Sequence, residues 1–119
     1  MDLNFFDKMA LSTFTSIEKQ SLYQLLCGAM IIDGNRDARE IAVINEVKQI
    51  MGISVADVEA SRKLSQPTMT STLRSMDTLK KAYVVKFMAQ VILADGVVSQ
   101  KEEQFFYYMH ELLDLPNMD

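Results

Sequence analysis

The sequence predicts an all-α fold, a bundle of six or seven helices in a single domain covering residues 1–119. Its apolar residues recur every three or four positions, which is typical of helices that bury one face. The chain contains only two prolines and four glycines, so few positions interrupt a helix. Hydrophobic residues make up 49% of the chain, and a domain of this length can bury one sizeable core.

Capping residues and apolar stripes place the individual helices. Thr15-Ser16-Ile17-Glu18 has the form of a capping box, and Gly52 stands where a left-handed residue ends a helix. The expected helices cover residues 15–32, 38–51, 54–62, 78–94 and 100–113, with one or two further turns over 4–9. The residues expected to face the core are Ile17, Leu22, Leu25, Leu26, Ala29, Met30, Ile41, Ile44, Val47, Ile50, Met51, Val84, Phe87, Met88, Val91, Ile92, Phe105, Phe106, Met109, Leu112 and Leu113.

The segment 63–71 is the strongest loop candidate. Pro67 disfavours helical dihedrals at Gln66, and serine and threonine residues surround the proline. A brief helix over 69–75 is the alternative.

An internal repeat becomes visible when the chain is shifted by 62 residues, so that segment 25–53 falls on segment 87–115. Core positions then match in type, and each half reads as helix, glycine turn and capped helix, which is an αα-hairpin. We therefore expect two pseudo-symmetric hairpins, over about 17–53 and 78–115. The identical pairs are Asp33 with Asp95, Gly34 with Gly96, and Glu40 with Glu102.

Each residue of the repeated turn has a structural role. Gly34 and Gly96 follow a helix end, where a positive φ is required. Asp37 and Ser99 each precede the next helix, where their oxygens can accept a free backbone N–H. A glutamate three positions later completes an Asp-x-x-Glu or Ser-x-x-Glu cap.

The two aspartates are harder to explain by structure alone. Asp33 and Asp95 are expected in the last turn of a helix, where the helix dipole disfavours a carboxylate by about 0.3–1 kcal/mol. A compensating partner is therefore expected in both halves. The candidates are the N–H groups of the next helix, the turn amides, a basic side chain such as Arg36, or a cation.

The second half, Ile92-Leu93-Ala94-Asp95-Gly96-Val97-Val98-Ser99-Gln100-Lys101-Glu102, resembles the tellurite-resistance TerB-like family. That family's signature is Ala-Asp-Gly, an aliphatic residue two places on, a small polar residue and then a glutamate. The first half departs from it, with Ile32 for the alanine and Arg36 for the aliphatic residue. The resemblance covers residues 17–115 and implies an all-helical domain whose acidic residues bind divalent cations. It also implies a link to stress response, tellurite resistance and the cytoplasmic side of the membrane.

Oxygen ligands for a hard cation such as Ca²⁺ or Mg²⁺ therefore gather at two turns. Neither turn matches the EF-hand loop, which requires several acidic ligands at alternate positions. The alternative is that these residues only cap helices and bind turn amides, and capping alone accounts for most of them. If one turn binds a cation, Asp95 and Glu102 are favoured. The candidate ligands are Asp33, Asp37 and Glu40 in the first half, and Asp95, Ser99 and Glu102 in the second.

Composition excludes several classes of protein. A net charge of −4 and a pI of about 4.9 argue against a nucleic-acid binder, because an acidic surface repels phosphates. A single cysteine excludes a disulfide scaffold and fits a reducing compartment. No export signal and no apolar run long enough to cross a bilayer is present, so a cytoplasmic location is expected.

Enzymatic activity is not expected. The chain has one histidine, His110, and contains no Glu-x-x-His pair, which excludes a di-iron carboxylate centre. Cys27 lies in an apolar helix, where a small core residue is the usual role. No nucleophile motif and no glycine-rich phosphate loop occurs. We therefore expect no catalytic residues and no organic cofactor.

With enzymes and nucleic-acid binders not expected, we expect the protein to be a non-enzymatic module. It would act through an unidentified protein partner, with or without a divalent cation at the Asp-Gly turns. Met69 and Met76, in the irregular middle segment, could form a binding surface, although ordinary packing is the simpler interpretation. Lys80, Lys81 and Lys86 could contact anionic lipid, and the alternative is a solvated face. The other interpretation is a helical scaffold whose acidic turns are purely structural.

Overall fold

The computed structural model describes residues 2–32, 34 and 36–117, and within these ranges every regular element is a helix. The all-α fold class is therefore confirmed. The molecule measures 33 × 32 × 31 Å along its principal axes. The helices are α1 (Phe5–Leu11), α2 (Ser16–Ile31), α3 (Ala38–Met51), α4 (Val55–Lys63), α5 (Gln66–Arg74), α6 (Thr78–Leu93) and α7 (Gln100–Leu112).

The helices begin where the caps predict. At the start of α2, the Thr15 N–H donates to Glu18 Oε1 at 2.8 Å, and the Glu18 N–H donates back to Thr15 Oγ1 at 3.3 Å. Ser99 and Glu102 form the same reciprocal box at the start of α7. Gly52 ends α3 with a φ of 65°. These local signals therefore located the helices without reference to tertiary packing.

The loop expected over 63–71 is wrong, because α5 begins within it. Ser65 caps this helix by accepting the Thr68 N–H at 3.2 Å, and Pro67 is its second residue. A proline is tolerated in the first helical turn, where its missing N–H would have had no partner inside the helix. Pro67 therefore belongs to the start of a helix, which extends further than the alternative prediction of 69–75.

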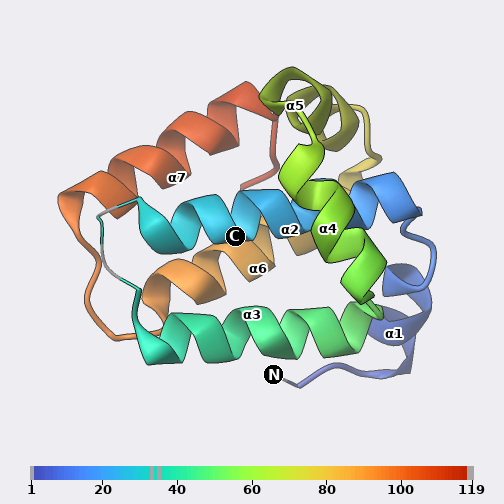
Figure 1. Cartoon of the computed structure of the whole chain (residues 1–119), viewed down its shortest axis with the longest axis horizontal. Helices are drawn as coiled ribbons and strands as arrows, with labels where there is room; N and C mark the ends of the chain where they lie inside the picture. Colours follow the sequence, from blue (N-terminus) through green and yellow to red (C-terminus); the bar gives the residue numbers. More distant parts are fainter. Residues whose placement is uncertain (1, 33, 35, 118–119) are drawn as a thin grey trace.

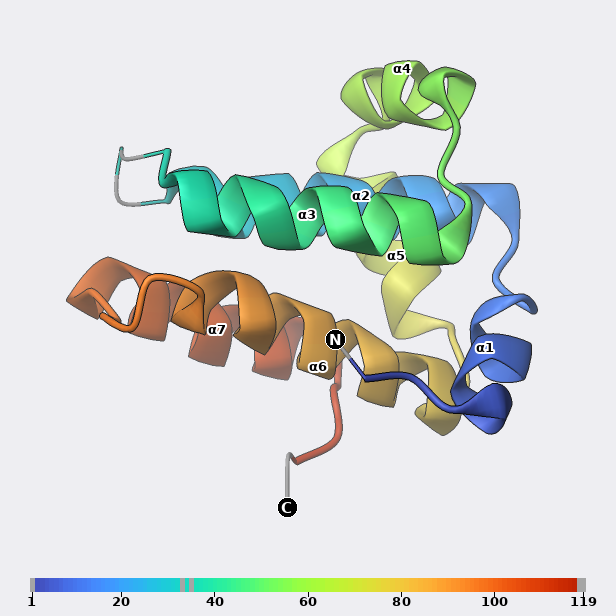
Figure 2. The same ribbon diagram turned by 90° about the horizontal axis from the view of Figure 1, so that it is seen from below.

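Helix α2 lies at the centre of the bundle (Figure 1). Helix α4 crosses in front of it and α6 lies behind it, while α5 crosses α2 and packs against it. Figure 2 shows the same order from another side, with α4 outermost above α2 and α3, and with α6 and α7 below them. Helix α6 has no counterpart of α4 on its outer side (Figure 2).

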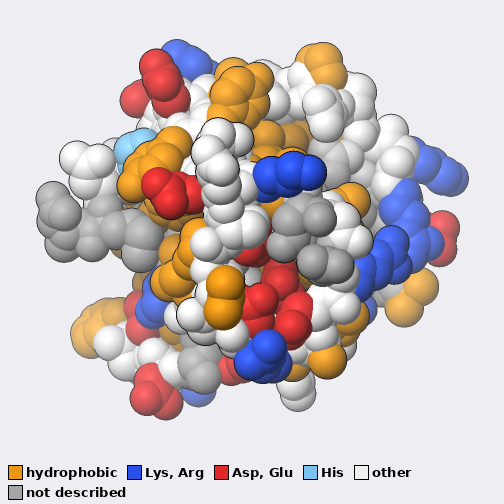
Figure 3. Space-filling model, turned by 90° about the vertical axis from the view of Figure 1, so that its left-hand side faces the viewer, with side chains coloured by type: hydrophobic (Ala, Val, Ile, Leu, Met, Phe, Trp, Pro, Cys, Tyr) orange, Lys and Arg blue, Asp and Glu red, His pale blue; other side chains and the backbone are white. Residues whose placement is uncertain are grey.

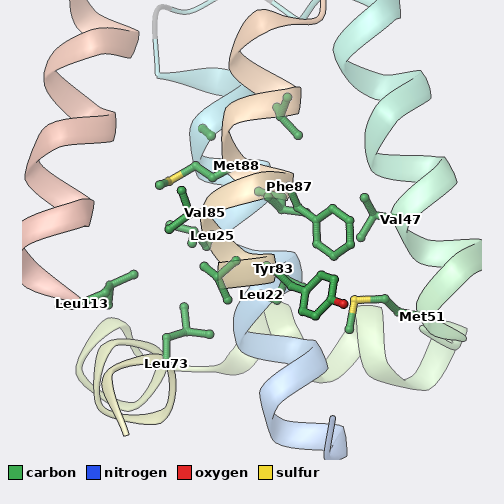
Figure 4. Close-up of a cluster of buried hydrophobic side chains, with 14 of the residues drawn as sticks. Leu22, Leu25, Val47, Met51, Leu73, Tyr83, Val85, Phe87, Met88 and Leu113 are labelled. Atoms are coloured by element: carbon green, nitrogen blue, oxygen red, sulfur yellow. The ribbon is translucent and has the colours of Figure 1, made fainter. Parts of the chain in front are cut away.

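The core is formed where α2 and α6 meet their neighbours (Figure 4). Phe87 of α6 lies toward Val47 of α3, and Tyr83 lies toward Met51 (Figure 4). Leu73 of α5 and Leu113 close the opposite side and are fully buried. One hydrophobic cluster therefore joins both halves of the chain.

Some residues expected to face the core do not. Ile17 and Ile41 are exposed, and Phe105, Phe106 and Met109 of α7 are only half-buried. Ile17 lies in the first turn of α2, and an end turn has fewer neighbouring helices to cover it than a central one. Helix α7 contacts few other helices, so its apolar stripe is covered incompletely.

Helix α1 is attached to α6 by a polar contact. The Tyr83 hydroxyl donates to Asp7 Oδ1 at 2.6 Å. Burial, together with this bond to a carboxylate, raises the pKa of Tyr83 to about 12. The Tyr83 bond also lowers the pKa of Asp7, because it favours the ionised carboxylate. Helix α1 otherwise contacts the bundle sparingly.

Candidate functional site

The two Asp-Gly corners lie at the same end of the molecule (Figure 1). Gly34 and Gly96 both adopt a positive φ, 84° and 78°. Each glycine N–H donates to the carbonyl three residues earlier, to Ile31 at 2.9 Å and to Leu93 at 3.0 Å. Figure 3 looks onto this end and shows acidic side chains gathered near its middle, beside basic ones.

The sequence indicated that Asp95 lies in the last turn of a helix, and this prediction is wrong. Helix α6 ends at Leu93 and Ala94 is its C-cap, so Asp95 is one residue further on. Its Oδ1 accepts the N–H of Val97 at 2.9 Å. The turn amide therefore supplies the compensating partner that was expected for this carboxylate. Asp33 lies outside the described residues.

Asp37 caps α3 and carries an ion pair. Its Oδ1 accepts the Arg39 N–H at 2.7 Å, and the Arg39 guanidinium contacts both carboxylate oxygens at 3.2 Å. The guanidinium and the backbone N–H lower the pKa of Asp37. The pKa of Arg39 is raised by Asp37 and also by the charge of Asp95, so Arg39 links the two corners electrostatically. Sequence reasoning had suggested Arg36 and overlooked Arg39.

The two glutamates of the repeat are both buried, with 1% of Glu40 and 2% of Glu102 exposed. Glu102 Oε1 accepts the Ser99 N–H at 3.0 Å, and the Glu102 N–H donates to Ser99 Oγ at 3.1 Å. The second oxygen, Oε2, is buried, and no group among the described residues donates a hydrogen bond to it. A buried carboxylate oxygen in this state usually has a donor or a cation, so it is the least expected feature of the corner.

No metal-binding group is evident within the described ranges. Asp37, Glu40, Asp95 and Glu102 do not provide three ligands close enough together to hold an ion, and neither does any other described set of His, Cys, Asp or Glu. Asp37 contacts the Arg39 N–H and guanidinium, Asp95 accepts a turn amide, and Glu102 accepts the Ser99 N–H. Cation binding therefore stays a prediction.

Other singled-out residues have structural roles. His110 Nε2 lies 3.0 Å from the Pro116 carbonyl, and burial raises the pKa of the Cys27 thiol, which reduces its reactivity. Met69 and Met76 are buried, so the packing interpretation is confirmed for both. Nothing in these environments provides a nucleophile and base in contact.

The three lysines of α6 do not form a basic patch. Lys80 Nζ donates to Glu18 Oε1 at 2.8 Å, and both side chains are mostly buried. Lys81 is buried and donates to the Asp114 carbonyl at 3.2 Å. The charge of Lys86, the third lysine, lowers the pKa of Asp7 in α1. None of the described helices is both long and apolar enough to cross a membrane.

An apolar cleft opens between α6 and α7 near the same end of the molecule. Its volume is about 200 Å³ and its surface is almost entirely apolar. Leu93, Val98 and Tyr107 are exposed at its edge, and Val97 beside them is exposed as well. The lining residues are Ala89, Ile92, Leu93, Val98, Glu103, Phe106 and Tyr107.

Sequence reasoning missed this apolar cleft, because it assigned Ile92 and Phe106 to the core. The available signal was the pair Val97-Val98 in a turn, followed by Tyr107 on the polar side of α7. A large apolar residue in a turn is unusual, although one such residue alone indicates little.

Comparisons with known proteins identify a fold and no function. No family model matches the chain, and no curated protein matches it. A crystal structure of a protein of unknown function from Porphyromonas gingivalis W83 is similar over 99% of this chain and 88% of that one. The TM-score is 0.79 with 22% sequence identity, so this likeness shows that the two proteins share a fold.

Proposed function

We propose that this protein is a non-enzymatic helical module that binds a protein partner through the apolar cleft between α6 and α7. The observation that carries the proposal is the cleft itself, with an apolar interior and exposed Leu93, Val97, Val98 and Tyr107 around it. Contiguous exposed apolar surface is typical of interaction sites. A volume of about 200 Å³ suits one or two apolar side chains of a partner better than a larger ligand.

The proposed internal repeat supports this interpretation. At the offset of 62, α1–α2–α3 corresponds to α5–α6–α7, and both members of several corresponding pairs are buried. These pairs are Leu11 with Leu73, Phe14 with Met76, and Ile53 with Leu115. Helix ends correspond too, since the Ile53 N–H donates to the Lys48 carbonyl and the Leu115 N–H to the His110 carbonyl, both at 2.9 Å. Two pseudo-symmetric units joined by α4 account for these matches.

Helix α4 breaks the symmetry, because it covers the outer face of α2 only. Gln20 Nε2 donates to Asp57 Oδ1 at 3.0 Å. Gln24 Nε2 donates to the carbonyls of Ser61 at 2.9 Å and Leu64 at 2.7 Å. On α6 the corresponding positions are Ala82 and Lys86, neither of which contacts such a helix. The apolar cleft lies next on that face, where a partner would take the role that α4 has on α2.

Membership of the TerB-like family is part of the proposal and is supported by the residue pattern of the Asp-Gly turns. The cytoplasmic location and a role in stress response or tellurite resistance follow only from that resemblance. The shared fold alone assigns no task to either protein.

The test is partner capture with cleft variants. Ala89 lines the apolar cleft, so Ala89→Leu should fill it, whereas Ala82→Leu adds the same atoms on the exposed part of α6. We expect a cell-extract protein that is retained by the wild-type chain and by Ala82→Leu, and is lost with Ala89→Leu. If the same proteins are retained by all three chains, the cleft is not the binding site.

A divalent cation at the Asp-Gly corners is the second candidate, and it is favoured by the buried Glu102 Oε2, to which no described residue donates. The candidate ligands are Asp95 and Glu102, and because the described carboxylates do not bring three ligands together, these two would be the protein's contribution to the site. Ca²⁺ or Mg²⁺ would suit such carboxylates.

Thermal unfolding of chelator-treated protein tests this candidate. Ca²⁺, Mg²⁺, Mn²⁺ or Zn²⁺ should raise the Tm if the ion binds only the folded state, because binding then stabilises that state by about 2.7 kcal/mol at a hundredfold excess over Kd. Asp95→Asn should abolish the shift and leave the fold intact. No shift with any of the four ions would exclude the cation.

A further inference from the structure

Phe5 and Phe6 of α1 form a second uncovered apolar feature, here called the Phe pair. Their side chains are 70% and 76% exposed, and their rings contact each other edge to face with centroids 5.9 Å apart. Met9, one turn further on, is exposed as well. Two adjacent exposed phenylalanines on a short helix are unusual in an isolated molecule, because burying each ring would lower the free energy of the folded protein.

The Phe pair and the apolar cleft match in size and chemistry. A cavity of about 150 Å³ lined by apolar side chains accommodates benzene, so a cleft of about 200 Å³ has room for one phenyl ring. Its lining presents Ile92, Val98 and Phe106 to a ring and offers almost no polar surface. One phenylalanine can therefore enter while the second covers the exposed edge at Leu93.

Their charges are also complementary. Lys8 follows the Phe pair in α1 and is exposed. Glu103 lies on the wall of the apolar cleft and is exposed. A ring inserted from α1 would bring the ammonium group of Lys8 toward the carboxylate of Glu103, which favours this pairing over one with a like-charged partner.

The two features lie at opposite ends of the molecule (Figure 1). Helix α1 packs beside the start of α6, whereas the cleft lies at its end, so one copy cannot place its own Phe pair in its own cleft. A single contact between two copies leaves one Phe pair and one apolar cleft free, so further copies can add or the assembly can close on itself.

We infer that the apolar cleft of one copy receives the Phe pair of a second copy, and that the chain associates head to tail through this contact. The inference rests on the proposed function, since it names the occupant of the same cleft. The contact is small and is expected to be weak and reversible.

The experiment uses sedimentation equilibrium of the full chain over roughly 0.02–1 mM, where a small interface of this kind should associate. The mass of the wild-type chain should rise with concentration above that of the monomer, because each contact joins the Phe pair of one copy to the cleft of another. Phe5→Ser/Phe6→Ser removes the Phe pair, and Ala89→Leu fills the cleft. Each should weaken association by about ten- to a hundredfold, the factor expected for one buried phenyl ring.

Mixing the two variants gives the sharpest result. Each variant alone should show this weakened association. Together they should form a 1:1 pair that does not grow, because one variant supplies the Phe pair and the other supplies the open cleft. Val55→Ser and Ala82→Leu are the matched controls, since both alter exposed apolar positions elsewhere and should associate as the wild type does. Val98→Asp, at the exposed edge of the cleft, replaces Ala89→Leu if that variant does not fold.

A charge exchange tests the orientation. Lys8→Glu and Glu103→Lys should each weaken association, and the double variant should restore it. A wild-type chain that stays monomeric at 1 mM overturns the inference, while capture of another protein by the cleft would leave the proposed function standing. Association that survives both Ala89→Leu and Val98→Asp also overturns it.

Discussion

Helix α2 of the first half of the chain and helix α6 of the second half lie in different surroundings. In the first half, α2 is covered on its outer side by α4 and packs extensively against α5, which crosses it. In the second half, α6 packs against α2 and α3, but its contacts with α1 and α7 are less extensive than those of α2 with α5 and α4. Corresponding residues such as Gln24 and Lys86 therefore differ in role, one fixing α4 in place and the other facing solvent in part.

This difference shows what decides burial in the bundle. The two corners share their glycine conformation, with Gly34 at φ 84° and Gly96 at φ 78°. Their caps differ, because Ser99 forms a capping box with Glu102 whereas Asp37 caps α3 through the Arg39 N–H. The segment that joins the halves forms α4, and α4 can lie against only one of them. The other half keeps an open apolar cleft for this reason, and not because its own sequence is less apolar.

The largest expected effect is the loss of stability from an alanine substitution in α5, which we compare with the same substitution in α1. Leu73 of α5 and Leu11 of α1 are both buried and correspond at the offset of 62. Leu73→Ala should reduce the free energy of unfolding by about 2–5 kcal/mol, because it leaves a cavity between tightly packed helices. Leu11→Ala should cost less, because the sparingly attached α1 can move to fill the space. Urea denaturation measures both.

Leu79→Ala is the control for this pair, since Leu79 is exposed and should change stability by less than about 0.5 kcal/mol. Equal losses from Leu73→Ala and Leu11→Ala would contradict the difference in packing between the two units.

The next effect concerns the buried carboxylate at the start of α7. Glu102→Ala should cost about 1.5–3 kcal/mol, since the Ser99 N–H loses a charged acceptor. Glu102→Gln should cost less, because glutamine can also complete a capping box. Thermal and urea unfolding distinguish the two variants. If glutamine is as harmful as alanine, the charge of Glu102 matters more than its hydrogen bond, which would favour the cation candidate.

A smaller effect, about 1 kcal/mol, is expected for the ion pair between the halves. Burial raises the pKa of Glu18, but the Lys80 ammonium and the Thr15 N–H lower it more, and the net shift is downward. A lowered pKa in the folded state stabilises the protein above the unfolded pKa of about 4.3, and this stabilisation is lost as the pH falls through the folded pKa. Glu18→Gln should therefore flatten the acid limb of the stability profile.

A double-mutant cycle with Lys80→Met isolates the coupling between these two side chains. Additive effects of the two substitutions at pH 7 would show that Glu18 and Lys80 do not stabilise each other, despite their separation of 2.8 Å.

The smallest expected effect is that of Pro67→Ala. Alanine fits the first turn of α5 without strain, so the change should stay below about 1 kcal/mol. Helix content measured by circular dichroism should not change. A large loss of helix would indicate that proline, and not the Ser65 cap, determines where α5 begins.

The sequence predicted the features that depend on neighbouring residues along the chain. The capping boxes and Gly52 placed five helices closely, because these signals act within one or two turns. The loop prediction failed at Pro67. Proline disfavours helical dihedrals at the residue before it, but it also fits the first turn of a helix. Local sequence alone does not distinguish these two effects.

The candidate site was predictable only in part. The residue types at the corners were identified, and the partner of Asp95 was among the alternatives considered. The pairing of Asp37 with Arg39 was not predicted, because Arg39 had been assigned only to the body of a helix. The apolar cleft depends on which outer face receives α4, and that is decided by tertiary packing that periodicity does not encode.

The Glu18–Lys80 contact has a consequence for the origin of the chain. Its two residues are 62 positions apart, which is the interval of the proposed repeat. They would therefore occupy the same position in the two units and face each other across the symmetry axis that would relate those units. In a dimer of identical ancestral units, an axial position would meet its own copy, and two glutamates or two lysines would repel. Opposite charges at this place require two independently mutable halves. If the proposed repeat arose by duplication and fusion, such a pair would be favourable only after the fusion, and it would disfavour pairing of either half with a second copy of itself.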